Sequence, residues 1–170
     1  MKKKLLLPLI MALSLSTAQA KSTANNVMHF STVDGKKIDM KITETGFDFT
    51  QFKGKSVLLD FFGPHCPPCL KEMPHLIELQ KEHKKDLVIL GVQVQKRMSN
   101  DELKDFMKRR EINYPVINLD DAMELVQFIQ TNTTWGGQIP YMLLFNKTGK
   151  LVETYTGLTD ISRIKKDMRK

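Results

Sequence analysis

Two nearly unbroken apolar runs mark the centre of the predicted fold. They are VLLDFF at residues 57–62 and LVILGVQV at residues 87–94. Runs of this kind are typical of central strands that are covered on both faces. Between them lie apolar positions at helical spacing, namely Leu70, Met73, Leu76, Ile77 and Leu79. This spacing predicts a helix from about residue 66 to residue 83.

Shorter elements flank this centre. In chain order they are a hairpin at 27–42 that turns at Val33-Asp34-Gly35-Lys36, a turn region at 49–55, a helix opened by the capping box Ser99–Glu102, a strand at 114–119, a helix at 122–130, strands at 141–145 and 151–155, and a last helix capped by Thr159 or Asp160. Strands alternate with helices early, and a hairpin comes late. The pattern predicts an α/β fold with a mixed central sheet and helices on both faces.

The first twenty residues resemble a targeting segment. Three lysines precede an apolar stretch at residues 5–15 that is too short to span a bilayer, and Ala18-Gln19-Ala20 is a small-x-small cleavage site. We interpret residues 1–20 as a signal peptide and residues 21–170 as one domain, with an uncleaved membrane anchor as the alternative. No cysteine lies near the cleavage site, which excludes a lipidated N-terminus.

The net charge of the chain tells little about its function. The formal net charge is +7, and removal of the three lysines of the signal peptide leaves +4. A mild surplus of this kind is normal for a solvated surface. Binding of nucleic acid would call for basic clusters interleaved with aromatic residues, so we expect no nucleic-acid partner.

The two cysteines lie close together, in the segment FFGPHCPPCLKEMP at residues 61–74. Such a pair can form a structural clasp, half of a metal site, or a redox couple. Export to an oxidising compartment would expose Cys66 and Cys69 to oxidants. A disulfide across two residues closes a very small loop and constrains the unfolded chain little, so stability alone is a poor reason for the pair.

Cys66 falls where a buried strand ends and a helix begins. Unpaired backbone N–H groups and the helix dipole favour the thiolate there. A free thiol with a pKa of about 8.5 is about 3% ionised at pH 7, whereas a thiol with a pKa near 7 is about half ionised. The placement predicts Cys66 as the attacking thiol and Cys69 as its resolving partner. Pro67 and Pro68 fall in the first helical turn, where missing N–H groups cost little, and they stiffen the segment.

Two acidic residues stand near the cysteines. Asp60 interrupts the apolar run, so burial should raise its pKa, and it could relay a proton to or from Cys69. A hydrogen-bonded structural role is the equal alternative. Glu72 lies one helical turn after Cys69, where most glutamates simply face solvent.

The segment VLLDFFGPHCPPCLKEMP resembles the active-site segment of thioredoxin-fold oxidoreductases. Within them it is most similar to the exported TlpA/ResA-like group, whose members often reduce disulfides during cytochrome c maturation. The similarity runs from the hairpin at residues 33–36 to the final helix. It implies a thioredoxin-like fold with an N-terminal β-hairpin extension and a strand–helix insertion. It also implies no cofactor besides a redox-active disulfide between Cys66 and Cys69.

Matched to that family position by position, Cys66 is the exposed nucleophile and Cys69 the resolving cysteine. Asp60 falls where thioredoxins keep a buried acid, and Glu72 where ResA-like proteins have a functional acidic residue. The resemblance thus implies catalytic roles for all four residues.

The resemblance also implies a substrate-binding surface. Ile139 and Pro140 match the loop whose cis proline lies against the disulfide. His65, Pro67 and Pro68 would border the same surface. Trp135 precedes this loop and is predicted to line the groove, with ordinary packing as the alternative.

One departure from the family concerns the residue before the first cysteine. His65 stands where an aromatic residue is common. If protonated it would further stabilise the Cys66 thiolate, and otherwise it is an idle spacer.

The favoured function is a periplasmic thiol-disulfide oxidoreductase that reduces disulfides of exported proteins. Apocytochrome c is the favoured client, and a membrane thiol shuttle is the implied electron donor. A general reductase, isomerase or oxidase is the alternative within this class. A copper carrier that uses His65, Cys66 and Cys69, or a binding module with an idle disulfide, are the distant alternatives.

Overall fold

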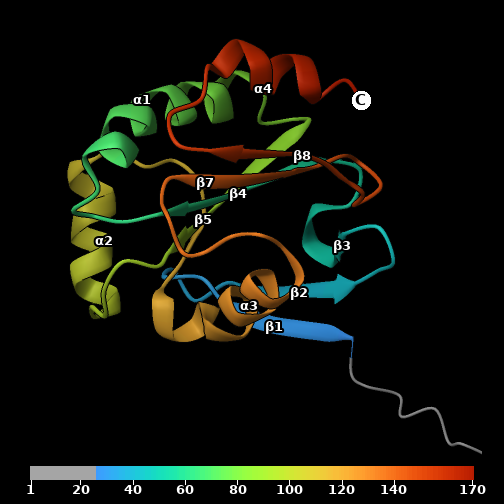
Figure 1. Cartoon of the computed structure of the whole chain (residues 1–170). Coiled ribbons are helices and arrows are strands. Elements are labelled where there is room, and N and C mark those ends of the chain that lie inside the picture. Colours follow the sequence, from blue (N-terminus) through green and yellow to red (C-terminus); the bar gives the residue numbers. More distant parts are fainter. Residues whose placement is uncertain (1–25) are drawn as a thin grey trace, which may run out of the picture.

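A five-stranded mixed sheet in the order β6-β5-β4-β7-β8 forms the centre of the molecule (Figure 1). The computed structural model describes residues 26–170. The strands are β4 (Ser56–Phe62), β5 (Leu87–Gln93), β6 (Val116–Ile117), β7 (Tyr141–Phe145) and β8 (Leu151–Thr156). β4, β5 and β6 are parallel, whereas β7 is antiparallel to both β4 and β8. The prediction of a mixed sheet is confirmed.

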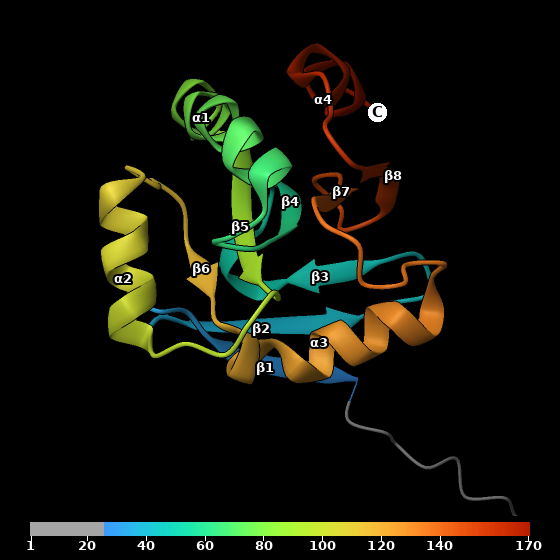
Figure 2. The same cartoon turned by 60° about the vertical axis from the view of Figure 1, so that its left-hand side comes forward.

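Helices cover both faces of this sheet, as predicted. They are α1 (Pro67–Glu82), α2 (Asn100–Arg109), α3 (Leu119–Asn132) and α4 (Ile161–Asp167). Side chains of α1, α2 and α4 share one apolar cluster with the sheet, and side chains of α3 share the other. Figure 2 shows α1 and α4 on one side of the sheet and α3 with β1 and β2 on the other. None of the helices in the described range is long and apolar enough to cross a membrane.

The predicted N-terminal hairpin belongs to a separate antiparallel sheet. Its strands are β1 (Val27–Ser31), β2 (Lys37–Ile42) and β3 (Phe47–Phe49). Gly35 takes a φ of 80° in the turn, which a glycine adopts without steric cost. β3 was not predicted, because three residues give almost no alternation and the 3₁₀ turn η1 (Thr50–Phe52) follows at once. The small sheet packs on α3 and on the central sheet through one aromatic-rich cluster.

Two predicted boundaries are corrected. The strand expected at 114–119 is only Val116–Ile117, because the side chain of Asn118 accepts a hydrogen bond from the N–H of Leu119 at 2.9 Å and caps α3 there. Asp160 and not Thr159 caps α4, and its carboxylate accepts from the N–H of Ser162 at 2.8 Å. The capping box of α2 is confirmed. The predicted signal peptide, residues 1–20, lies outside the described residues.

Candidate active site

The two cysteines lie at the start of α1, directly beyond the carboxyl end of β4. They form a disulfide, and Cys66 is the N-cap of the helix. The backbone N–H of Cys69 points at the sulfur of Cys66 at 3.2 Å. Pro67 and Pro68 occupy the first two helical positions, as predicted, so their missing N–H groups cost the helix no hydrogen bond. The sulfur of Cys66 therefore lies in the field that the sequence predicted for it.

The expectation that Cys66 is exposed is wrong for this oxidised form. Its exposed fraction is 4%, against 3% for Cys69. Both sulfurs belong to an apolar cluster that includes Phe62 and Met73, and Ile139 packs against this cluster from the opposite loop. In this oxidised form neither sulfur therefore presents an open surface to a substrate.

Asp60 lies on the same face of the sheet as the disulfide. Side chains alternate along β4, and its neighbours Leu58 and Phe62 belong to the cluster that holds both cysteines. Burial raises the pKa of Asp60 to about 8, and the nearby charge of Glu72 adds to this rise. The predicted desolvation is confirmed.

A glycine opens the space beside Asp60, and a tyrosine fills it. Gly91 on β5 pairs in register with Asp60. A Cβ atom built on Gly91 would lie 3.3 Å from Cε2 of Tyr114, so the tyrosine ring lies close against the glycine. Burial, with the nearby charges of Asp60 and Glu72, raises the pKa of Tyr114 well above its usual value. Tyr114 therefore belongs to the acidic site.

Glu72 turns inward from α1 and is not a solvated helix residue. One carboxylate oxygen accepts from the backbone N–H of Thr159 at 2.9 Å. The other is buried and has no hydrogen-bond partner among the described residues, and the same holds for the hydroxyl of Tyr114. Burial raises the pKa of Glu72 to about 7, although the bond from Thr159 opposes the rise.

Although it is buried, Glu72 borders a surface depression. Together with His75 and Leu158 it lines a surface depression of about 270 Å³. Asp60 is enclosed, whereas Glu72, whose charge acts on Asp60, borders this depression. Two carboxyl groups whose pKa values lie near neutrality can exchange a proton at physiological pH. The arrangement can therefore supply or remove a proton beneath the disulfide.

The predicted substrate loop has its expected backbone form. The Ile139–Pro140 peptide bond is cis. Ile139 is half-buried, Pro140 is buried, and the carbonyl of Pro140 accepts from the N–H of Gly157 at 2.9 Å. A role of Ile139, Pro140, Pro67 and Pro68 in substrate binding stays a prediction.

Trp135 lies in the core and not on the surface that a substrate would contact. Its ring stacks on Tyr141 with 5.2 Å between centroids and lies 4.8 Å from the ring of Phe61. Its indole N–H donates to the carbonyl of Gln138 at 2.7 Å, which fixes the loop before the cis proline. The packing alternative fits these contacts, and the predicted substrate contact does not.

His65 is exposed beside the disulfide. Its backbone N–H donates to the side-chain oxygen of Gln95 at 2.7 Å. The residue borders a depression of about 370 Å³ that is also lined by Phe106 and Arg109 of α2 and by Arg110, the C-cap of this helix. His65 is therefore placed where a substrate could touch it, and its effect on Cys66 stays a prediction.

Sequence reasoning missed Tyr114 and Thr159. The only signal for Tyr114 was its position just before a short strand, and Thr159 acts through its backbone alone. Among the described residues no group of three or more His, Cys, Asp or Glu side chains is arranged to hold a metal ion.

The mixed sheet, the Cys-x-x-Cys disulfide at the start of α1 and the cis-proline loop together define the class of thioredoxin-fold proteins. The chain belongs to the Redoxin family, whose profile matches residues 19–168. The family resemblance predicted from the sequence is thereby confirmed.

Individual proteins agree with this assignment. The thiol-disulfide oxidoreductase ResA of Bacillus cereus is 32% identical over 126 residues, which make up 74% of this chain and 63% of that protein. The match thus spans less than two thirds of the length of ResA.

Solved structures share the fold. The chain is similar to a thiol:disulfide interchange protein of Chlorobium tepidum, with a TM-score of 0.67, 23% identity, and coverage of 85% of this chain and 92% of the other. It is also similar to the exposed lipoprotein thioredoxin Etrx1 of Streptococcus pneumoniae, with a TM-score of 0.63, 25% identity, and coverage of 84% and 98%.

Proposed function

We propose that this protein is a thiol-disulfide oxidoreductase that reduces disulfide bonds of exported proteins. One observation carries the proposal: the Cys66–Cys69 disulfide lies at the start of a helix and above two buried carboxyl groups whose pKa values are about 8 and about 7. Neither the helix position nor the buried acids would be needed by a structural clasp. The similarity to ResA, which is named a thiol-disulfide oxidoreductase, supports the same activity.

The first step uses the reduced protein. The thiolate of Cys66 attacks one sulfur of a substrate disulfide, so that an S–S bond forms between Cys66 and the substrate while the substrate S–S bond breaks. The sulfur that leaves takes a proton from solvent. The N–H of Cys69 and the helix dipole favour the thiolate that attacks.

The second step releases the substrate. The thiol of Cys69 gives its proton to the carboxylate pair, and the resulting thiolate attacks the sulfur of Cys66. The Cys66–Cys69 bond forms, the mixed disulfide breaks, and the second substrate sulfur leaves as a thiolate that is protonated. Two electrons have then passed from the protein to the substrate.

Asp60 and Glu72 share the proton transfer in this scheme. Asp60 is enclosed and, in its ionised form, takes the proton from the region of Cys69, and Glu72 passes it towards the depression that it lines with His75. A general base works best when its pKa lies near the working pH, which fits the values of about 8 and about 7.

The proposal also covers the compartment, the electron donor and the client protein. The pattern of residues 1–20 supports export to the periplasm, as does the likeness to a pneumococcal thioredoxin named an exposed lipoprotein. A reductase in an oxidising compartment must be reduced again, so a membrane thiol shuttle is the proposed donor. Apocytochrome c is the proposed client, on the family resemblance alone.

A trapping experiment tests the activity. Cys69→Ala leaves Cys66 able to attack but unable to resolve, so substrates should accumulate as mixed disulfides with the protein. Cys66→Ala is the matched control and should trap none, because Cys69 lies inside the helix and lacks the N-cap position. Non-reducing gels followed by mass spectrometry give the readout. Equal or absent trapping by both variants argues against the proposed reductase.

A second experiment separates the client from the chemistry. Haem-stained cytochromes c are compared between cells with and without the gene, each with and without added reductant. Loss of cytochromes that reductant restores supports apocytochrome c as client. Normal cytochromes together with successful trapping point to a general reductase, isomerase or oxidase of exported proteins.

A further inference from the structure

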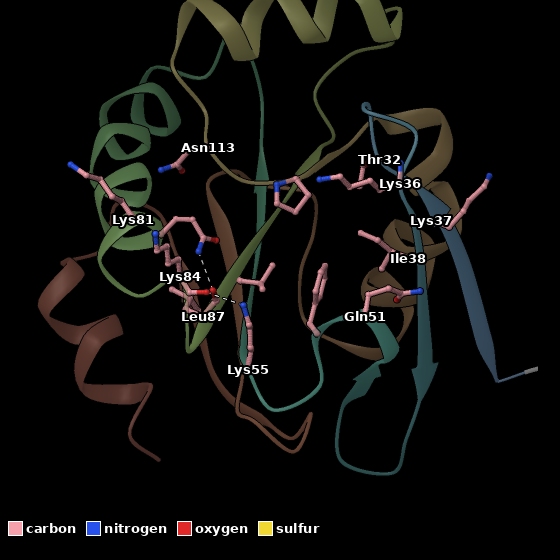
Figure 3. Close-up of a pocket in the computed structure, with 14 residues that line it drawn as sticks. Thr32, Lys36, Lys37, Ile38, Gln51, Lys55, Lys81, Lys84, Leu87 and Asn113 are labelled. Atoms are coloured by element: carbon pink, nitrogen blue, oxygen red, sulfur yellow. Dashed lines mark hydrogen bonds between the residues drawn. The ribbon is translucent and has the colours of Figure 1, made fainter.

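A second cavity lies at the other end of the central strand. It has a volume of about 740 Å³ and is lined by the β1–β2 hairpin on one side and by the end of α1 on the other (Figure 3). Lys55, directly before β4, and Leu87, the first residue of β5, border it. The disulfide follows the opposite end of β4, and a seven-residue strand spans about 20 Å. The cavity is therefore separate from the redox site.

The cavity is strongly basic. Its lining residues include five lysines, namely Lys36, Lys37, Lys55, Lys81 and Lys84. Among the described residues that line it there is no Asp or Glu. Lys81 pairs with Glu78 at 3.5 Å, whereas the other four lysines make no ion pair with the described residues. Lysines this close together repel one another, so these four favour an anion.

Two of these lysines are directed at the cavity. Figure 3 shows the side chain of Lys36 extending from the hairpin into the space, whereas Lys37 and Lys81 point away. The ammonium of Lys36 makes no ion pair or hydrogen bond with the described residues. The ammonium of Lys55 donates to the carbonyl of Lys84 at 2.8 Å, which fixes its position and leaves two further N–H donors.

The remaining walls are mainly apolar. They include Ile38, Phe52, Leu87, Val88 and Pro115, all buried or half-buried. The amide of Gln80 offers little, because it already bonds to the carbonyl of Leu87 at 3.0 Å and to the N–H of Ile89 at 2.6 Å. Ammonium groups are thus the main free donors. The volume is in the range of sites for small molecules, about 300–1,000 Å³.

We propose that this cavity is a second ligand site, which binds a small amphiphile with an apolar body and a carboxylate, sulfonate or phosphate group. A neutral molecule would leave the lysines without a counter-charge, and an inorganic anion would leave the apolar wall in water. A ligand with both parts satisfies both. The site is independent of the proposed redox function.

A pair of fluorescent probes tests the charge requirement. 8-Anilinonaphthalene-1-sulfonate and N-phenyl-1-naphthylamine share one ring system, and only the first carries a sulfonate. The oxidised full-length protein should bind the sulfonate with one site per chain and about tenfold more tightly than the neutral probe, since a hydrogen bond to a charged group contributes about that factor. Equal affinities, or several weak sites per chain, would overturn the proposal.

Matched variants test whether the sulfonate binds in this cavity. Lys36→Gln with Lys55→Gln should weaken sulfonate binding by about tenfold and leave the neutral probe unchanged. Lys108→Gln with Lys166→Gln changes the net charge equally at exposed helix positions outside the cavity, and it should bind like the wild type. The same loss in both double variants would mean a general charge effect and would refute the site.

Two further measurements cover poor folding of the double variant and binding of an acidic peptide. The single variant Lys36→Glu, at an exposed hairpin position, covers the case in which the double variant folds poorly, and it should lose sulfonate binding while its melting curve stays that of the wild type. A hexaglutamate peptide should not displace the bound sulfonate. Displacement at a similar concentration would reassign the cavity to acidic protein segments and would refute the amphiphile.

Discussion

At the scale of single residues, Asp60 dominates the electrostatics of the site. Its carboxyl is enclosed between apolar neighbours, and burial holds its pKa at about 8. Proteins bury an uncompensated carboxylate only at a cost in stability. That cost is consistent with a role of Asp60 in proton transfer. It can be measured from the stability of the protein, without any substrate.

Asp60→Asn should remove a pH dependence from the oxidised protein. The pKa of Asp60 is about 8 in the folded protein and ordinarily 3.8, so the folded state binds more protons between these pH values. The free energy of unfolding of the wild type should therefore fall as the pH rises from about 4 to about 8, by up to about 1.4 kcal/mol per unit. Urea unfolding at several pH values measures it.

Asp60→Asn should lose the part of the pH dependence that Asp60 causes. It should keep the smaller part that comes from Glu72, whose pKa is about 7. Its advantage over the wild type should be small near pH 4 and largest at pH 8. Asp105→Asn, on the exposed side of α2, is the control and should keep the full slope. Parallel curves for the wild type and Asp60→Asn would contradict the buried, protonated state.

Two of the three buried tyrosines allow a paired prediction. The hydroxyl of Tyr114 has no partner among the described residues, whereas that of Tyr155 donates to Asp167 at 3.0 Å. Tyr155→Phe should lower the free energy of unfolding by about 1–2 kcal/mol, and Tyr114→Phe should leave it unchanged or raise it. Chemical denaturation measures both. A larger loss for Tyr114→Phe would show that its hydroxyl is bonded in solution.

At the scale of elements, the sequence predicted the strands and helices that carry strong patterns. The apolar runs at 57–62 and 87–94 are β4 and β5, and the helix predicted over 66–83 is α1. The three-residue β3 was missed because so short a strand gives no periodicity. The start of α3 was placed three residues late, because its capping Asn118 looked like part of a strand.

The site was predictable only in part, for a similar reason. The position of Cys66 follows from local order along the chain: strand, then cysteine, then helix. The proximity of Asp60, Glu72 and Tyr114 depends on how three separate elements pack, and no local pattern contains it. The burial of Cys66 likewise depends on Ile139, which comes from a loop more than seventy positions later.

The packing around the site requires the small residue Gly91. A Cβ atom on Gly91 would lie 3.1 Å from Val116 and 3.2 Å from Phe62, besides its contact with Tyr114. These distances are tighter than ordinary packing, so Gly91→Ala should destabilise the protein by about 1–3 kcal/mol.

Gly136→Ala is the matched control for this prediction. A Cβ there meets only the side-chain oxygen of Gln138 at 3.4 Å, so thermal unfolding should change little. Equal stability of the two variants would mean that the strand region around Gly91 has more room than the structure gives it.

At the scale of the whole molecule, the small N-terminal sheet and the central sheet share one apolar core. Phe47 of β3 joins them: its ring centroid lies 5.2 Å from that of Phe145 on β7 and 5.6 Å from that of Phe128 on α3. Because these contacts connect all three layers, we expect the described part of the chain to unfold as a single cooperative unit.

Phe47→Ala should therefore destabilise the whole domain, by about 3–5 kcal/mol. Tryptophan fluorescence, which reports on the buried Trp135, and far-UV circular dichroism should still give coincident denaturation curves. Leu158→Ala, at an exposed apolar position, is the control and should have almost no effect. Separate transitions in Phe47→Ala would mean that the N-terminal sheet is an independent unit.

The proposed mechanism depends most on the unequal chemistry of the two thiols. The most direct measurement is the rate of iodoacetamide labelling of the reduced protein across a pH series, with mass spectrometry to assign the labelled cysteine. We predict that Cys66 is labelled first and titrates with a pKa near 7, whereas Cys69 reacts slowly throughout. If both cysteines are labelled at equal rates with the pKa of a free thiol, about 8.5, the proposed catalytic role of this pair is contradicted.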